Sequence, residues 1–241
     1  LIYDQTCAAE KRRRRKRGLY PDPARRVFIN EAVCEGCGDC NTASNCVAIR
    51  PLETALGRKR VIDQSSCNKD FSCLDGFCPS FVTVEGGALK ISAPPVVDSA
   101  NPAAGLPEPT PVNIDGSYNI LLTGIGGTGV ITVGAGLGMA AHIEGKGCAV
   151  LDQTGLAQKN GAVMSHVSIS NDPDTVMATR IGTAMSDLVI GFDMVVAAGQ
   201  AAINTMSATR TRAVINDHLV PLAAFAERPD MPLEAGGYTN V

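Results

Sequence analysis

The sequence predicts two units, an α+β unit rich in cysteine and an α/β unit with a doubly wound parallel sheet. Seven of the nine cysteines lie between residues 34 and 78. Two β-branched runs, at 26–30 and 60–63, each precede a cysteine-rich loop within a few residues, which indicates two similar halves. A strand, a glycine loop and an apolar helix follow one another from residue 118 onward, the order typical of a βαβ unit. The predicted boundaries are 1–20 for a basic tail, 21–90 for the cysteine unit, 91–116 for a linker and 117–241 for the second unit.

The first segment is dominated by a run of basic side chains, residues 11–17. A run of like charges is typical of a solvated or disordered arm, and a docking surface for an acidic partner is the alternative. No aromatic residue interrupts the run, which argues against binding of single-stranded nucleic acid. Because Leu1 is not an initiator methionine, we expect the chain to be a piece of a longer polypeptide, with residues 1–20 ending a preceding domain.

The cysteine spacing of the first half is typical of an iron–sulfur site. Cys34, Cys37 and Cys40 are separated by two residues each, so the three thiolates can curl around one cubane cluster. In proteins with two clusters, a last cysteine followed by proline reaches across to the cluster of the other half. Cys78, which precedes Pro79, has this position. The sequence therefore predicts one four-iron cluster held by Cys34, Cys37, Cys40 and Cys78.

The second half repeats this frame with one change, since Asp70 stands where the middle cysteine is expected. Cys46, Cys67 and Cys73 remain as thiolate ligands. A site of this kind either keeps four irons (4Fe-4S) with a carboxylate ligand or holds three (3Fe-4S). In either case we expect the two clusters to titrate differently, because hard carboxylate ligation shifts the reduction potential.

Disulfide bonds and zinc are the competing interpretations of these cysteines. Disulfides suit small secreted proteins, but no leader pattern precedes the cysteines, and the second unit is of a type usually found inside cells. Zinc sites pair two short cysteine hooks around one ion, whereas a triple run offers three ligands in one turn. Iron–sulfur ligation is therefore the preferred interpretation. Cys7 and Cys148 lie outside both frames and are expected to be buried structural thiols.

The other elements of the cysteine unit agree with two similar halves. Residues 26–30, 60–63 and 81–85 are predicted strands, and a glycine turn follows the last of them. A unit with two such halves and two predicted clusters is a two-cluster ferredoxin-like α+β domain. Its apolar core is small, so we expect it to depend on its clusters for folding. The prolines of 91–116 then predict an extended, semi-rigid linker.

The second unit begins with the clearest element pattern of the chain. Strand 118–123, helix 130–143 and strand 148–152 form the βαβ opening of a doubly wound, Rossmann-like sheet. The further elements are shorter apolar runs, in which helix and strand are hard to distinguish. They are predicted as strands at 163–170, 194–198 and 212–216 and as helices at 183–190 and 200–208.

The loop between the first strand and the helix carries four glycines, Gly124, Gly126, Gly127 and Gly129. The first permits a tight turn, the second permits close approach of a ligand, and the last permits packing of the helix on the strand. Asp152, at the end of the second strand, has the position of a residue that binds a ribose hydroxyl. NAD, a phosphate-bearing acyl carrier and an interface without ligand remain as alternatives.

Composition limits the remaining possibilities. The net charge is −3 and 45% of the residues are hydrophobic, so no general attraction to nucleic acid is expected. No apolar run is long enough to span a membrane, and the chain is expected in the cytoplasm. Lys159 and Arg180 could contact phosphates or be surface charges. The three histidines, His142, His166 and His218, show no metal-binding spacing, and no catalytic residue is assigned.

Four stretches of the sequence resemble one known family. They are 4–15 (DQTCAAEKRRRR), 33–40 (VCEGCGDC), 62–73 (IDQSSCNKDFSC) and 124–129 (GIGGTG). Together they resemble the long, fused indolepyruvate ferredoxin oxidoreductases, members of the 2-oxoacid:acceptor oxidoreductase superfamily. The cysteine block with Asp70 is the most specific part of this resemblance, and the glycine loop is the least specific.

The resemblance implies an enzyme that decarboxylates an aryl 2-oxoacid with thiamine diphosphate and magnesium. Such an enzyme passes electrons singly through iron–sulfur clusters to ferredoxin or another acceptor and transfers the acyl group to coenzyme A. The thiamine site would lie outside this segment, residues 117–241 would correspond to a gamma-type domain, and contacts with other domains of the same enzyme and a homo-oligomer are implied. The alternative function is a non-catalytic iron–sulfur electron carrier joined to a nucleotide-binding domain.

Overall fold

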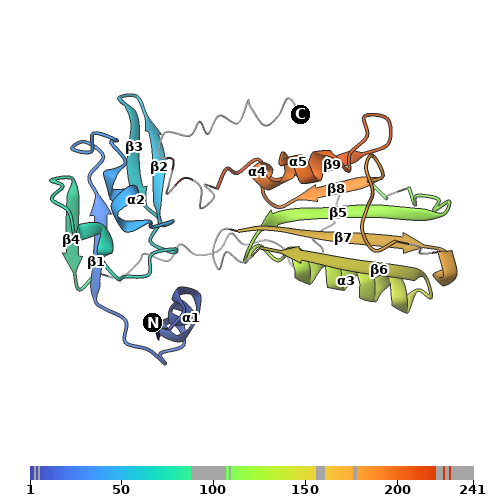
Figure 1. The fold of residues 1–241 in the computed structure, drawn as a ribbon, viewed down its shortest axis with the longest axis horizontal. Coiled ribbons are helices and arrows are strands. Elements are labelled where there is room, and N and C mark those ends of the chain that lie inside the picture. Colours follow the sequence, from blue (N-terminus) through green and yellow to red (C-terminus); the bar gives the residue numbers. More distant parts are fainter. Residues whose placement is uncertain are drawn as a thin grey trace.

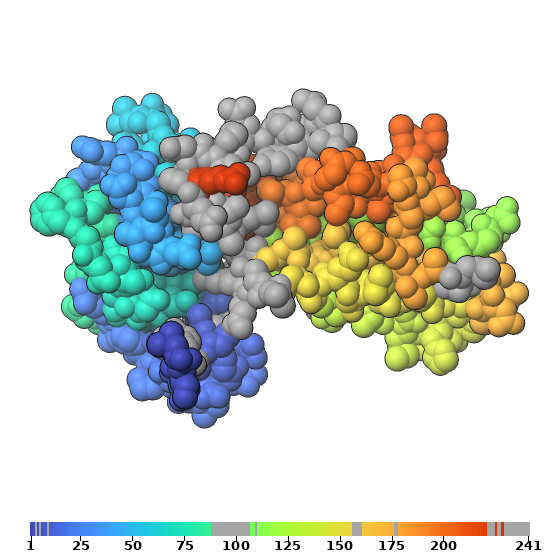
Figure 2. All heavy atoms as spheres, in the orientation of Figure 1, coloured from blue at the N-terminus to red at the C-terminus, as the bar shows by residue number. Residues whose placement is uncertain are grey.

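The structure is a computed structural model that describes residues 1–2, 4, 6–87, 107–108, 110–155, 161–175, 178–220, 225 and 228. Figure 1 shows two units, one with strands β1 to β4 and the other with strands β5 to β9. The space-filling view in Figure 2 shows them as two lobes, coloured blue to teal and green to red. Most of the predicted linker lies outside the described residues. No helix within the described ranges is both long and apolar enough to cross a membrane.

The cysteine unit is built from two antiparallel strand pairs. In chain order its elements are α1 (Ala8–Lys16), β1 (Arg25–Ile29), α2 (Asp39–Ser44), β2 (Ile49–Thr54), β3 (Gly57–Ile62), the 3₁₀ turn η1 (Ser72–Leu74) and β4 (Phe81–Glu85). β1 pairs with β4, and β2 forms a hairpin with β3. The predicted strands at 26–30, 60–63 and 81–85 are confirmed within a few residues, and β2 is additional. Each half therefore runs from a strand through a cysteine loop and a helical turn to a second strand.

The core of this unit is small, and thiols form part of it. Val27, Ala48, Ile49 and Ile62 make up its buried centre. The cysteines that pack against this centre are Cys40, Cys46, Cys67 and Cys73. Because so few apolar side chains are buried here, the thiol groups carry a substantial share of the packing.

The second unit contains one five-stranded sheet with strand order β6-β7-β5-β8-β9. Its elements are β5 (Ser117–Ile125), α3 (Val130–Ile143), β6 (Gly147–Thr154), β7 (Ala162–Ser170), the 3₁₀ turn η2 (Pro173–Thr175), β8 (Leu188–Gly191), α4 (Met194–Ala197), α5 (Gln200–Ile203) and β9 (Arg212–Ile215). Helix α3 has the predicted bounds. The strands predicted at 118–123, 148–152, 163–170 and 212–216 are confirmed.

The sheet is mixed, so the prediction of a doubly wound parallel sheet was wrong in this respect. β5 and β6 run in the same direction, as a βαβ unit requires, but β7 lies between them and is antiparallel to both. Parallel pairing is limited to β5, β8 and β9. The connection between β6 and β7 spans only residues 155–161, whereas a parallel crossover needs roughly a dozen residues or more. The chain therefore returns antiparallel after β6.

Three short elements differ from their predictions. The predicted helix at 183–190 gives way to β8, the predicted strand at 194–198 is helix α4, and the predicted helix at 200–208 is confined to α5. Asp193 explains the start of α4, because its carboxylate accepts a hydrogen bond from the backbone N–H of Val196 at 2.9 Å. This is an N-cap contact. Short apolar runs give no periodicity that separates helix from strand.

Helices cover both faces of the sheet (Figure 1). Ile120 and Leu122 of β5 pack in one buried cluster with Val130 of α3, whereas Leu121 packs in another with Ala202 of α5. This alternation follows from the two-residue period of a strand. β5, which is buried over most of its length, is therefore the centre of the unit.

Gly134 and Gly136 provide a matched test of how closely α3 lies on the sheet. A Cβ atom at Gly134 would collide with the hydroxyl of Ser165 in β7, whereas one at Gly136 would meet nothing within 4 Å. We expect Gly136→Ala to raise the free energy of unfolding by about 0.5–1 kcal/mol, because alanine is the better helix former. Gly134→Ala should lower it by about 1–3 kcal/mol through overpacking. Urea denaturation followed by circular dichroism measures both, and two effects of the same sign would contradict this packing.

Candidate functional site

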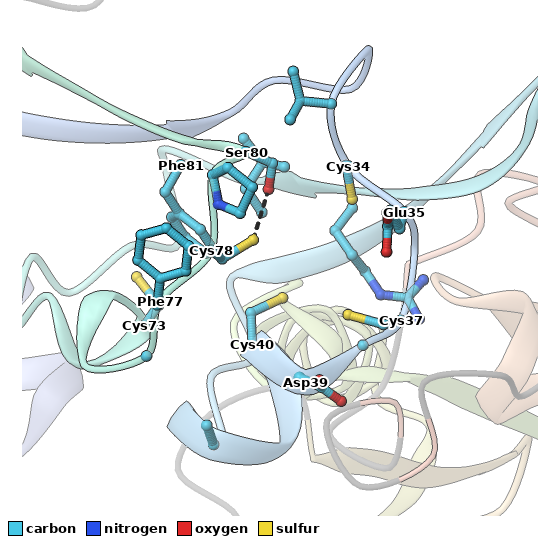
Figure 3. A pocket seen from close by; sticks show the side chains of 17 residues that line it. Cys34, Glu35, Cys37, Asp39, Cys40, Cys73, Phe77, Cys78, Ser80 and Phe81 are labelled. Carbon is cyan, nitrogen blue, oxygen red and sulfur yellow. Dashed lines mark hydrogen bonds between the residues drawn. The ribbon is translucent and has the colours of Figure 1, made fainter.

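Four thiols face one cavity in the cysteine unit. Cys34, Cys37, Cys40 and Cys78 line a cavity of about 460 Å³, and Figure 3 shows their sulfur atoms pointing toward a common space. Cys34 is buried and Cys40 half-buried, while Cys37 and Cys78 are exposed. The structure thus brings together the four residues predicted for the first site, three from the first half of the unit and one from the second.

Strand β3 shapes the loop that carries the first three cysteines. Gly36 has a φ of +77°, and a Cβ atom there would collide with the backbone carbonyl oxygen of Arg58. Gly38 has a φ of +83° at the start of α2. The Nζ atom of Lys59 donates a hydrogen bond to the carbonyl oxygen of Cys34 at 2.7 Å. Glycine at both positions allows the loop to curl back against β3 and to present its thiols on one side.

A short chain of hydrogen bonds joins Cys78 to Cys34. The Sγ atom of Cys78 lies 3.0 Å from the hydroxyl oxygen of Ser80, which Figure 3 marks. The carbonyl oxygen of Ser80 accepts a hydrogen bond from the backbone N–H of Asn30 at 2.7 Å, and the carbonyl oxygen of Asn30 accepts one from Cys34 at 2.9 Å. Asn30, which follows β1 directly, therefore fixes the two ends of the four-thiol set relative to each other.

Burial opposes ionisation of Cys40. The pKa of this thiol is raised to about 11, chiefly by burial, while the positive charge of Arg60 acts in the opposite direction. Arg60 is 2% exposed and lines the same cavity. A metal must displace the proton of a thiol that it binds, so binding of metal in this cavity would release protons.

Lys59 and Arg60 are functional candidates that sequence analysis missed. A signal was present for Arg60, because a strand that buries Ile62 directs residue 60 to the same face two positions earlier. The burial pattern of β3 confirms this, with Arg60 and Ile62 buried. A charged residue at a core-facing position is unusual enough to be a candidate for function.

A second group of thiols lies next to the first. Cys46, Cys67 and Cys73 all pack against the core of the unit. Burial, followed by the neighbouring Cys46, Cys67 and Asp70, raises the pKa of Cys73 to about 12. Cys46, Cys67 and Asp70 are thus close enough to Cys73 for their charges to act on it. Cys73 also lines the first cavity, so the two groups are adjacent.

The second cysteine loop repeats the backbone of the first without its glycines. Lys69 and Phe71 have φ values of +53° and +63°. They stand two and four residues after Cys67, just as Gly36 and Gly38 stand after Cys34. A left-handed conformation costs a residue with a Cβ about 1–2 kcal/mol. Such a conformation persists only where the surrounding structure imposes it.

Contacts outside the loop support both left-handed residues. The Nζ atom of Lys69 forms an ion pair of 2.7 Å with the carboxylate of Asp22 and donates to the carbonyl oxygen of Pro23 at 3.1 Å. The guanidinium of Arg25 lies 5.0 Å from the centroid of the Phe71 ring, a cation–π contact. The segment that precedes β1, together with the first residue of β1, therefore stabilises the conformation of the second loop.

The basic run is helical and not disordered, and four of its seven side chains, those of Arg13, Arg14, Lys16 and Arg17, are exposed as the prediction of a solvated segment expects. It lies in α1, where Arg15 is the most buried basic side chain of the ion pairs, with 9% exposure. Arg15 donates hydrogen bonds to the carbonyl oxygen of Asn68, next to Cys67, and to that of Pro21 at 3.0 Å. At least one residue of the run thus contacts the second cysteine loop directly.

Asp70 is exposed and turns toward its own loop. Its Oδ1 atom accepts hydrogen bonds from the backbone N–H and the hydroxyl of Ser72, at 3.4 and 3.2 Å. Ligation by this carboxylate would exchange these weak hydrogen bonds for a metal bond. The assignment of Asp70 as a ligand stays a prediction.

The spacing of the acidic groups and thiols bears on the zinc alternative. Within the described ranges, no three His, Cys, Asp or Glu side chains are close enough to hold a single metal ion. Four thiolates around one zinc ion lie about 3.8 Å apart, given a Zn–S bond of about 2.3 Å in a tetrahedron. In a four-iron cluster each thiolate binds a different iron, and the irons occupy alternate corners of the cubane. The distances between thiolates are therefore longer than around one zinc ion. Which of the two groups the four-thiol cavity holds stays a prediction.

The glycine loop of the second unit serves packing and turn geometry in this structure. A Cβ atom at Gly124 would lie 2.7 Å from the Val130 side chain and 3.0 Å from that of Phe192. Gly127 and Gly129 have φ values of +96° and +92°. The N–H of Gly126 already donates to the carbonyl oxygen of Gly161 at 2.9 Å. Binding of a phosphate by this loop stays a prediction.

Asp152 lies far from that loop along the sheet. It faces Ser165 of β7, which on its other side faces Leu122 of β5. Two strand spacings, about 10 Å, separate Asp152 from Leu122. Gly126, the first residue after β5, lies four residues beyond Leu122, about 13 Å in an extended chain. This separation arises because β7 is inserted between β5 and β6. In a parallel βαβ unit without an inserted strand, β5 and β6 would be adjacent. A ligand that touches both would have to span β7.

The histidines are not gathered into a metal site. His166 is buried, and its pKa is lowered by burial and then by the charge of Arg180. Its Nδ1 atom accepts a hydrogen bond from the backbone N–H of Ile181 at 3.3 Å, a structural role. His142 and His218 are exposed, Cys7 and Cys148 are only half-buried, and Lys159 lies outside the described residues.

Fold and site together define a class of protein in which a domain with two similar cysteine loops precedes an α/β domain with a mixed sheet. Residues 119–231, just under half of the chain, match the family described as Pyruvate ferredoxin/flavodoxin oxidoreductase.

Two curated relatives are the indolepyruvate oxidoreductase subunits IorB of Pyrococcus horikoshii and Thermococcus kodakarensis. Each is 32% identical over 78 residues, which cover 32% of this chain and only 37% of the relative. Among solved structures, pyruvate oxidoreductase subunit PORC of Thermotoga maritima is 16% identical over 47% of this chain and 56% of its own, with a TM-score of 0.34. A keto/oxoacid ferredoxin oxidoreductase gamma subunit of Geobacter sulfurreducens is 23% identical over 44% and 54%, with a TM-score of 0.32.

The thiols should differ in reactivity when the protein is free of iron. At pH 8, we expect iodoacetamide to modify Cys40 and Cys73 at least about tenfold more slowly than the exposed Cys37. Their raised pKa values leave little thiolate, and the higher intrinsic nucleophilicity of such thiolates offsets only part of this loss. Peptide mass spectrometry over time gives each rate, and circular dichroism verifies that the sample is folded. Equal rates in the folded protein would contradict the burial of these thiols, whereas urea should make the rates converge.

Proposed function

We propose that this chain is the electron-transfer and acyl-handling portion of an indolepyruvate ferredoxin oxidoreductase. The intact cytoplasmic enzyme would decarboxylate an aryl 2-oxoacid to an acyl-CoA, and this segment would carry the electrons to ferredoxin. The observation that carries the proposal is the single cavity lined by Cys34, Cys37, Cys40 and Cys78. The family match over 119–231 and the likeness to IorB subunits support the class of enzyme.

The four thiols of this cavity would hold a first [4Fe–4S] cluster. A cluster of this type takes up and releases single electrons. The chain itself positions the thiols. β3 packs against the loop and maintains its turns, and Asn30 links the loop to the segment of Cys78. Burial of Cys34 and partial burial of Cys40 limit solvent access. Rigid placement of this kind keeps the thiols in the geometry needed for binding without rearrangement.

The second thiol group would hold a second cluster, with Asp70 as its fourth ligand or with one iron fewer. Cys46, Cys67 and Cys73 lie in the same neighbourhood as Asp70. The exposed carboxylate gives this cluster a ligand that water can displace. The acyl-handling part of the proposal rests on the family resemblance and assigns no residue of the glycine loop to coenzyme A.

Metal and sulfide analysis tests the proposal directly. Anaerobically purified protein should contain roughly seven to eight irons and about eight acid-labile sulfides per chain, and redox-poised EPR should show two clusters. Cys37→Ser should remove about half of the iron, while Cys148→Ser, in the other unit, should leave the iron content unchanged. A colourless protein loaded with zinc would overturn the proposal.

Activity of the intact polypeptide separates the enzyme from a non-catalytic electron carrier. Reduction of a dye by indolepyruvate should require both thiamine diphosphate and coenzyme A. A protein that holds two clusters and shows no such turnover when complete would be a carrier.

Asp70→Cys should give a second cluster that keeps four irons after mild oxidation, because a thiolate replaces the displaceable carboxylate. The wild-type second cluster should lose one iron under the same conditions and show the EPR signal of a three-iron cluster. Asp75→Cys, at an exposed position close by, is the matched control and should lose iron like the wild type. If Asp70→Cys loses iron to the same extent, Asp70 is not a ligand.

A further inference from the structure

Helix α1 is anchored to the cysteine unit through one of its faces. Lys11 and Arg15, which lie one turn apart, both pack over the ring of Tyr20, with their charged groups 5.5 and 5.6 Å from the ring centroid. Arg15 also donates a hydrogen bond to the carbonyl oxygen of Asn68, next to Cys67. Side chains one turn apart share a face of a helix. The basic side chains between and after these two therefore lie on other faces.

The exposed side of the helix carries four basic side chains, which together form the outer face of α1. They are Arg13, Arg14, Lys16 and Arg17, the last at the C-terminal cap. Glu10 is the acidic residue of the helix, and its carboxylate is shared by Arg13 at 3.1 Å and Arg14 at 3.0 Å. One carboxylate thus stands against four cations, and the outer face keeps a positive net charge. Figure 1 shows α1 at the edge of the unit, outside its strand pairs.

Stability of the helix itself does not account for this charge. Arg12 and Lys16 are four positions apart, as are Arg13 and Arg17, and like charges at this spacing repel each other across a helical turn. Only the last turn gains from cations, through the partial negative charge of the helix C-terminus. The whole chain has a net charge of −3, so the positive charge is local. A negatively charged surface bound at the outer face would relieve the repulsion.

The helix lies beside the second thiol group. The hydrogen bond from Arg15 to Asn68 joins it to the second cysteine loop. The carboxylate of Asp22 connects the same two segments, since it lies 2.7 Å from the Nζ atom of Lys69 and 3.8 Å from the Nε atom of Arg15. A helix with its side chains is about 10–12 Å across. A protein bound at the outer face is therefore separated from the second cysteine loop by roughly the width of this helix.

From these contacts we propose that the outer face of α1 is the docking surface for an acidic electron-carrier protein, which collects electrons from the second cluster. The proposal rests on the proposed function. In each transfer one electron leaves the second cluster and one arrives at the oxidised iron–sulfur centre of the carrier, and no bond or proton is exchanged. Electron-transfer complexes are small and short-lived, and complementary charge steers the encounter. A nucleic acid is the less suitable partner, because the ring of Tyr20 packs against Lys11 and Arg15 instead of being presented to bases.

Binding of a fluorescently labelled, acidic plant-type ferredoxin to the full chain tests this surface. Lys16→Gln combined with Arg17→Gln should raise the dissociation constant about 5- to 10-fold at an ionic strength of about 0.1 M, where the Debye length is about 10 Å. At about 1 M salt, wild type and variant should bind equally weakly. Glutamine is a good helix former, so α1 should stay folded, which circular dichroism verifies. The matched control removes the same charge from the second unit by Arg212→Gln with Arg228→Gln, two exposed arginines, and should leave the constant within about twofold of wild type.

Electron transfer gives a second measurement on the same proteins. When the reduced full chain is mixed with oxidised ferredoxin in a stopped-flow instrument, the second-order rate constant should fall about tenfold in the variant of Lys16 and Arg17. Salt should slow the wild type steeply and the variant only slightly. The midpoint potentials of both clusters, measured by redox-poised EPR, should be the same in the two proteins. The change would then lie in the encounter with the carrier and not in the driving force.

The outcomes separate the docking surface from the proposed function. Wild-type protein without iron and sulfide would overturn both. Wild-type protein that holds two clusters but binds ferredoxin no more tightly than the variant of Lys16 and Arg17 would overturn only the docking surface. Equal weakening in the control variant would reveal a general effect of net charge, which would also contradict it. An RNA oligonucleotide that binds more tightly than ferredoxin and is released by the same variant would assign the outer face to nucleic acid, and the inference would be wrong.

Discussion

The contact between the first cysteine loop and β3 is the constraint on which the four-thiol cavity depends. Three successive residues of β3 act on the same feature: the carbonyl of Arg58 excludes any side chain at Gly36, Lys59 holds the carbonyl of Cys34, and Arg60 borders the cavity. β3 belongs to the second half of the unit, as does Cys78. Each half therefore supplies contacts on which the cysteine loop of the other half depends, and neither half forms this cavity alone.

The two halves share one backbone design and differ in how it is maintained. Glycine gives the first loop its left-handed turns at little cost. The second loop forms the same turns with Lys69 and Phe71, supported by Asp22, Pro23 and Arg25. The difference extends to charge, because a buried arginine borders one thiol group and a carboxylate stands beside the other. Two sites of common geometry thus acquire different electrostatic surroundings.

The thiol arrangement could be predicted from the sequence because ligand spacing is a local property. Two residues between successive cysteines let one loop present its thiols on one side, and a final cysteine before proline has the position that reaches across to the other half. Arg60 was missed although the period of its strand places it on the face of Ile62. Lys59 could not be predicted, because only the packing of the first loop on β3 decides what its side chain contacts. The support that Asp22 and Arg25 give to the second cysteine loop was likewise not predicted, because it depends on contacts between residues far apart in the sequence.

The sheet of the second unit shows where local patterns are insufficient. β5 and α3 were predicted well, since nine strand residues followed by an apolar helix give a strong signal. The position of β7 between β5 and β6 was not, because the sequence of a strand does not state which neighbours it pairs with. α4 was predicted as a strand although Asp193, its N-cap, stands directly before it. That cap was a usable signal.

The left-handed residues of the second loop also affect the order in which the unit can form. The glycines of the first loop allow its turns from local preference, before any distant contact exists. Lys69 and Phe71 are held in the same conformation by side chains about fifty residues earlier in the chain, including Asp22 and Arg25. Closing a connection of that length is costly in chain entropy. During folding, we therefore expect the second cysteine loop to be the later of the two to reach its native backbone, once the segment with Asp22 and Arg25 has docked.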